Sequence, residues 1–178
     1  MQKKTHFTRK KHYPWVVISL CAFFLFYKYI LQTYPGLITH DLQREFKLSG
    51  AGLGNLAAAA FYSYTIMQLF VGVLLDRFGT RTLASLALLV SSVGLIWFSF
   101  ADTLTNAVIA RLLMGFGIAF ATVSYMKMAA VWFPANQFAF VAGLLATAAM
   151  IGAIFGQAPL ALMFAKHGWR ASLFDWGI

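Results

Sequence analysis

The amino-acid sequence predicts an all-α membrane protein, a polytopic helical bundle, from two observations. Mean hydropathy is +0.73, with 61% hydrophobic and only 11% charged residues, whereas soluble domains are about a quarter charged. The chain also contains long apolar runs, and about 20 apolar residues suffice to cross roughly 30 Å of hydrocarbon. Backbone polar groups find no water in lipid, so helices are the expected spanning elements.

Five spanning helices and the start of a sixth follow from the apolar runs in a transmembrane domain over 14–178. The first run is too long for a signal peptide and no small-x-small cleavage site follows it, so we expect it to remain uncleaved. Short polar links such as DRFGTRT, ADTLT and WFPANQ separate the later runs and make neighbouring helices antiparallel. The expected helices cover about 14–38, 50–75, 82–100, 105–130, 138–164 and, truncated by the end of the sequence, from 171.

The charge distribution argues for a membrane surface and against nucleic acid as a partner. The net charge is +9, but five of the fourteen Lys and Arg residues lie in the first eleven positions. We interpret 1–13 as a basic cytoplasmic tail that touches anionic lipid, with the remaining cations scattered near helix ends. The Lys and Arg excess in the tail and in the link around 77–81 predicts a cytoplasmic N-terminus. The expected location is the cell inner or plasma membrane, crossed several times.

Several classes of site are excluded by the residues available. The single cysteine, Cys21, forms no internal disulfide, and no metal-binding cluster is present. The histidines all lie in the tail or the links, and the sequence contains no H-E-x-x-H or G-x-G-x-x-G spacing. We therefore predict no catalytic residues, no metal and no cofactor, and we do not expect an enzyme.

The stretch GVLLDRFGTRTL predicts a tight helical hairpin at a membrane surface. A glycine turns the chain, two arginines hold the hairpin at the cytoplasmic face, and the aspartate can meet a helix N-terminus or an arginine. The spacing resembles the loop signature of the major facilitator superfamily, G-x-L-x-D-R-x-G-x-R, which is matched by Gly72, Leu74, Asp76, Arg77, Gly79 and Arg81.

Further stretches carry the same resemblance. ARLLMGFGIAF, with Arg111, Gly115 and Gly117, is similar to the superfamily pattern R-x-x-x-G-x-G, and WFP and GWR are familiar landmarks. GAIFGQAPLAL only loosely resembles the antiporter motif, because Pro159 stands three residues after Gly156, so we do not infer antiport.

The resemblance implies the N-terminal half of a transporter, built as a 3+3 inverted repeat whose first and fourth helices line a central cavity. It assigns conformational gating to Gly72, Asp76, Arg77, Gly79 and Arg81. The missing C-terminal half, or another chain, is expected to complete the transporter. The alternative is a truncated, non-transporting protein acting as an assembly subunit, receptor or inert fragment.

Lys28, within FFLFYKYIL, indicates what kind of solute the chain binds. Lys28 lies about 18 Å along the first helix, counted from Val16. Its side chain extends only about 6 Å, so the amine cannot reach either membrane surface. Exposing the charge to lipid costs at least about 2.5 kcal/mol, so Lys28 must face protein or water. Gln32 lies on the same side one turn later. No mid-helix carboxylate offsets the charge, which favours an anionic solute; pairing with an acid in the missing half, or a solvated crevice, stays open.

The function predicted is secondary active or facilitative transport by alternating access of a small polar solute that carries a carboxylate or phosphate. Organic anions, sugar acids, sugar phosphates and dipeptide-like solutes all fit. Coupling to H⁺ or Na⁺ stays open. Arg111 is expected to bond backbone carbonyls or neighbouring polar side chains, with proton or substrate coupling as the sharper option. Lys127 is expected to snorkel to the interface. The candidate substrate-binding residues are Lys28, Tyr27, Gln32, Arg111 and Tyr125.

Overall fold

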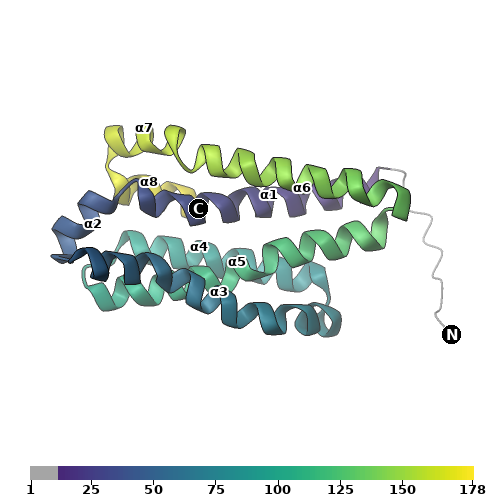
Figure 1. The fold of residues 1–178 in the computed structure, drawn as a ribbon, viewed down its shortest axis with the longest axis horizontal. Coiled ribbons are helices and arrows are strands. Elements are labelled where there is room, and N and C mark those ends of the chain that lie inside the picture. The colour runs from purple at the N-terminus through teal and green to yellow at the C-terminus, as the bar shows by residue number, and fades with distance from the viewer. Residues whose placement is uncertain (1–11) are drawn as a thin grey trace.

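A computed structural model describes residues 12–178, and this part of the chain is a bundle of helices without strands (Figure 1). Five helical stretches are long and apolar enough to cross a membrane. The all-α polytopic prediction is thus confirmed, while most of the expected basic tail, residues 1–11, lies outside the described residues. The elements are α1 (Tyr13–Thr33), η1 (Tyr34–Gly36), α2 (Thr39–Phe46), α3 (Gly50–Phe78), α4 (Thr80–Ser99), α5 (Leu104–Trp132), α6 (Ala135–Phe155), α7 (Ala158–His167) and α8 (Trp169–Gly177).

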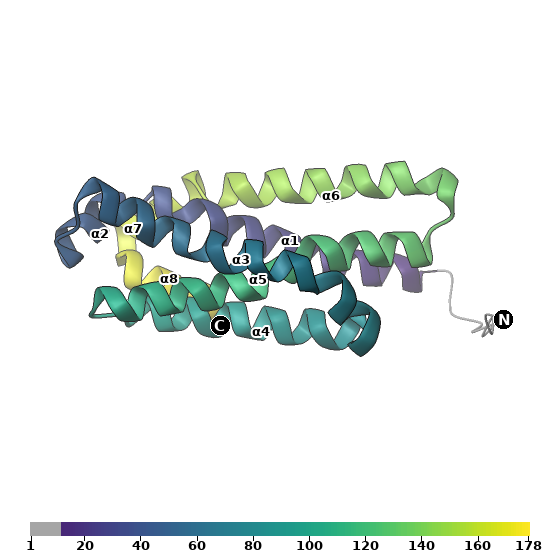
Figure 2. The ribbon, with the colours of Figure 1, turned by 60° about the horizontal axis from the view of Figure 1, so that its bottom comes forward.

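The bundle has two distinct ends (Figures 1 and 2). One end carries the start of α1 and the turns that join α3 to α4 and α5 to α6. The other end carries α2, the turn between α4 and α5, and the turn from α7 to α8. Helix α8 runs back along the bundle and stops partway, while α5 is the most buried of the spanning helices.

Glycines let α5 approach two of its neighbours, α3 and α4, closely. A methyl group on Gly115 would overlap the backbone carbonyl of Ala60 in α3, and one on Gly117 would overlap the hydroxyl of Ser91 in α4. Small residues at such positions bring helix backbones together in membranes, where packing replaces the hydrophobic effect as the source of association.

The same device joins α6 to α1. A Cβ on Gly152 would lie 2.5 Å from the carbonyl oxygen of Phe26, and one on Gly156 would overlap the hydroxyl of Thr33. The two glycines, spaced four residues apart, therefore allow α6 to pack closely against α1, as small-xxx-small pairs do in membrane helices.

Two of the expected helices are interrupted where proline lies in the apolar run. In place of one helix over 14–38, α1 ends at Thr33 and the YPG segment forms η1, after which α2 occupies most of the expected link. In place of one helix over 138–164, α6 ends at Phe155 and α7 begins at Ala158. Pro159 lacks an N–H and its ring would clash with the carbonyl of Phe155, four residues earlier.

The remaining helix boundaries differ by a few residues from those expected. Helix α8 begins at Trp169 instead of 171, directly after Gly168, whose φ of 79° favours glycine. Helices α3 and α5 extend beyond the expected 50–75 and 105–130, and α4 begins before the expected 82–100, differences of the size usual at helix ends.

Candidate functional site

Lys28 of α1 lies inside the bundle, with 4% of its surface exposed. Its Nζ donates to Oγ1 of Thr122 in α5 at 2.8 Å and to the hydroxyl of Tyr64 in α3 at 3.4 Å. Tyr64 is the central residue of the 29-residue α3, about 21 Å from either helix end at about 1.5 Å per residue. The amine therefore lies near mid-depth of the bundle, between three helices.

Aromatic rings complete the surroundings of the amine. Lys28 Nζ lies 5.1 Å from the ring centroid of Tyr29 and 5.0 Å from that of Tyr64, within the range of cation–π attraction. No carboxylate among residues 12–178 lies within ion-pair distance of Lys28. Neutral hydroxyls and ring faces alone hold this charge within the described residues.

Arg111 of α5 is also buried, with 1% of its surface exposed, but it is held differently. Its Nη2 donates to the carbonyl of Ala57 at 2.8 Å, and its Nη1 donates to the carbonyl of Leu31 and to the hydroxyl of Tyr34, both at 3.4 Å. The guanidinium thereby ties α5 to α3, α1 and η1, in the carbonyl-bonding arrangement expected from the sequence. Its Nε–H has no partner in the described residues.

A pocket of about 420 Å³ opens beside Arg111, between the end of α1, α2 and the first turns of α3. Gln32, Thr33 and Thr39 supply polar groups to its lining. Gln32 therefore lies with Arg111 at this pocket, although its spacing on α1 suggested the environment of Lys28.

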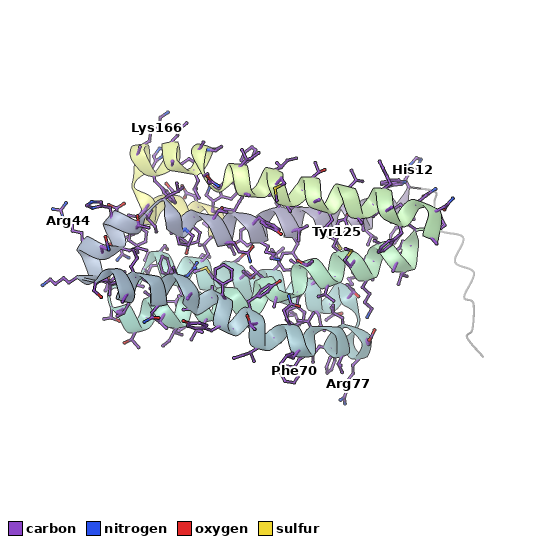
Figure 3. All side chains as sticks on the ribbon, viewed as in Figure 1. His12, Arg44, Phe70, Arg77, Tyr125 and Lys166 are labelled. Carbon is purple, nitrogen blue, oxygen red and sulfur yellow. The ribbon has the colours of Figure 1, made fainter. Side chains whose placement is uncertain are left out.

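The other two candidate residues lie elsewhere. The hydroxyl of Tyr27 shares a 3.4 Å hydrogen bond with Ser92 of α4. Tyr125 is fully buried and donates to the carbonyl of Val141 in α6 at 2.7 Å, as its place in Figure 3 beside α6 illustrates. The five candidates are thus divided among separate environments instead of forming one cluster.

The residues that do surround Lys28 had weak sequence signals. Thr122 lies close to the same face of α5 as Arg111, three helical turns later, but its contact with Lys28 spans 94 positions. Tyr64 and Tyr29 carry no motif of their own; the position of Tyr64 at the centre of a spanning helix is the one signal that could have found it.

The hairpin between α3 and α4 contains the residues assigned to gating. Gly79 turns the chain with φ of 85°, a conformation that glycine adopts readily. Asp76 pairs with Nζ of Lys127 in α5 at 2.7 Å, so the partner is neither an arginine nor a helix N-terminus, and Lys127 reaches this carboxylate instead of a headgroup. Arg77 lies on the outer surface of the bundle (Figure 3) with its guanidinium 5.6 Å from the ring centroid of Phe78.

The remaining gating candidates, Gly72 and Arg81, are exposed. A methyl group on Gly72 would meet nothing within 4 Å. This glycine therefore makes no close helix contact among the described residues, unlike Gly115 and Gly117 of α5 and Gly152 of α6.

The opposite end of the bundle is joined by Arg170 of α8. Its Nη1 donates to the carbonyl of Ser99 at 2.6 Å and its Nη2 to that of Ala101 at 2.7 Å, both at the end of α4. Nε and Nη2 also donate to the Glu45 carboxylate of α2. The arginine of the GWR landmark therefore links α8, α4 and α2.

Comparison with known proteins places these features in a family context. The family model described as Major Facilitator Superfamily matches residues 12–178. An uncharacterized transporter of Bacillus subtilis is 28% identical over 95% of the chain, a probable L-galactonate transporter of Escherichia coli 26% over 96%, and the chloroplastic ascorbate transporter of Arabidopsis thaliana 22% over 92%. The chain spans 39%, 38% and 30% of the lengths of these relatives, in that order.

Proposed function

The chain belongs to the major facilitator superfamily, and on that premise we propose that it forms part of a transporter that moves a small organic anion by alternating access. Its helices supply one wall of the pathway. A second half, from the same or another chain, supplies the facing wall, since the relatives are more than twice as long as the matched region. Transporter function is the common theme of the family and of the relatives' names.

The main support for an anionic substrate is the buried amine of Lys28. Its 4% exposure removes most of its hydration, and its partners are the neutral hydroxyls of Thr122 and Tyr64. A desolvated cation without a carboxylate partner is costly, and an incoming anion offsets that cost. Such sites near mid-depth are where transporters of this general design bind substrate.

The relatives' names support the same class of solute. Ascorbate and L-galactonate, named for two of them, are both small organic anions rich in hydroxyl groups. A hydroxylated acid suits the Lys28 environment, because the amine compensates the acid and nearby hydroxyls can bond the carbon chain.

A binding experiment tests the role of Lys28. The purified chain in lipid nanodiscs is heated with L-galactonate or with the uncharged sugar L-galactose, and the unfolding temperature is followed. A ligand that binds the folded state raises this temperature by mass action, so we expect stabilisation by L-galactonate and none by L-galactose. Lys28→Met should abolish the stabilisation, whereas Lys166→Met, which removes an exposed lysine of α7 (Figure 3), should retain it.

Equal stabilisation by the acid and the neutral sugar, or undiminished stabilisation of the Lys28→Met variant, would refute the proposed site. Transport is tested separately by counterflow of labelled L-galactonate into proteoliposomes in which the chain is reconstituted together with the half that supplies the facing wall. Transient accumulation of label supports transport, and its absence from correctly inserted protein that still binds L-galactonate favours a non-transporting role. Repeating the assay with imposed H⁺ or Na⁺ gradients tests cation coupling.

A further inference from the structure

The hydrogen bonds of Lys28 leave hydrogens without acceptors around the amine. An ammonium group has three donors and no acceptor, so the hydroxyl oxygens of Tyr64 and Thr122 must accept in their bonds to Lys28. Each hydroxyl therefore keeps its own hydrogen for another partner. Among residues 12–178 neither hydroxyl donates to an acceptor, and the third N–H of Lys28 also lacks one.

These donors come from three helices and converge on one place. Lys28 belongs to α1, Tyr64 to α3 and Thr122 to α5, and the amine bonds both hydroxyls. Lys28 is almost fully buried while Tyr64 and Thr122 are half-buried. The two hydroxyl groups therefore belong to side chains that are more exposed than Lys28.

The charge balance around the amine distinguishes between possible anions. One cation is present, and the faces of the Tyr29 and Tyr64 rings, 5.1 and 5.0 Å from Nζ, carry the negative side of the aromatic quadrupole. A carboxylate brings one negative charge that the amine compensates. A phosphate monoester carries about −1.5 to −2 at neutral pH, so part of its charge is left uncompensated beside the two rings.

We propose that Lys28, Tyr64 and Thr122 form a three-donor cradle for a single carboxylate, which selects monocarboxylates over phosphate monoesters. The N–H and the two O–H donors match the lone pairs of the two carboxylate oxygens. This assignment rests on the proposed function, because it adds two ligands and a substrate class to the site of Lys28.

Titration of L-galactonate against the purified chain in nanodiscs tests the cradle. Tyr64→Phe and Thr122→Val each delete one hydroxyl with little change in shape, and each should weaken binding about tenfold, the effect of one hydrogen bond to a charged group. Thr122→Ser restores a hydroxyl and should bind within about twofold of wild type, since the number of donors is unchanged. Tyr62→Phe, the same change at a 55% exposed site two residues away, should leave affinity unchanged.

The phosphate comparison uses L-galactose 1-phosphate, which should bind wild type at least about tenfold more weakly than L-galactonate. Equal affinity for the two anions overturns the selectivity. Wild-type affinity in both Tyr64→Phe and Thr122→Val overturns the cradle, and the proposed function survives that result if Lys28→Met has lost binding. Failure of wild type to bind L-galactonate, both alone and together with the half that supplies the facing wall, overturns both. Unfolding temperatures without ligand identify a damaged variant, and failure of Thr122→Ser to restore binding counts against the donor role.

Discussion

Replacing Gly115 with alanine is expected to destabilise the contact between α3 and α5. The added methyl group would overlap the carbonyl of Ala60 and the hydroxyl of Ser63. The first of these is backbone in the middle of a helix and cannot rotate away, so the two helices must separate. Separation also stretches the bond from the Ser63 hydroxyl to the carbonyl of Leu112, which is 2.7 Å long.

The size of the effect follows from these contacts. Overpacking costs about 1–3 kcal/mol, with a backbone overlap at the upper end, and a weakened hydrogen bond adds about 1 kcal/mol. The higher helix propensity of alanine offsets about 1 kcal/mol. The net loss is therefore about 3 kcal/mol, which lowers the unfolding temperature by about 6–12 °C in a chain of this length.

The assay is thermal unfolding of the purified chain in detergent, followed by tryptophan fluorescence. Gly143→Ala in α6 is the matched control, because a Cβ at Gly143 meets nothing within 4 Å. The control should unfold at the same or a slightly higher temperature, since it gains helix propensity without an overlap. If Gly115→Ala unfolds within a degree of wild type, the close approach of α3 and α5 is wrong.

Three further predictions concern the charged contacts, each read by the same unfolding assay. Arg111→Met removes the charged donors to the carbonyls of Leu31 and Ala57 and should cost about 3 kcal/mol, at about 1.5–3 kcal/mol per hydrogen bond to a charged group; an unchanged unfolding temperature would contradict its role as a helix tie. Arg170→Gln should cost about 2 kcal/mol and Glu45→Gln less, because the carbonyl bonds of Arg170 persist in the second variant; the reverse order would refute this account. A double-mutant cycle of Asp76→Asn and Lys127→Gln should give a coupling below about 1 kcal/mol, as for exposed pairs; a larger value would mean that the pair is desolvated.

The spanning helices could be predicted from the sequence because a membrane imposes length and hydropathy together. The interruptions at Pro35 and Pro159 could not be seen by the same criterion. One proline hardly changes the mean hydropathy of a run of about 20 residues. That average also contains no information about the missing backbone N–H. The position of a proline therefore indicates where a helix is interrupted, and the hydropathy of the run does not.

The residues that contact each buried charge could not be predicted from the sequence, for a different reason. Helical spacing places Arg111 and Tyr125 on one face of α5, yet Arg111 bonds α1 and α3 while Tyr125 bonds α6. A long central helix meets different neighbours at different depths, so a shared face does not imply a shared site. Likewise the partner of Asp76 lies 51 positions away in Lys127, at a distance fixed by helix packing and by no local pattern.

The two buried cations, Lys28 and Arg111, differ in the acceptors that hold them. Arg111 bonds two backbone carbonyls, which have no hydrogen to offer in turn, and the Tyr34 hydroxyl, whose hydrogen is donated to Sδ of Met114. Its bonds therefore join α1, α3 and α5. Lys28 bonds two hydroxyls, which accept from the amine and still have hydrogens to donate. The same three helices carry both sets of groups. Because the carbonyl bonds of Arg111 join these three helices, we expect Arg111→Met to weaken L-galactonate binding in the nanodisc titration, and an unchanged affinity would contradict this coupling.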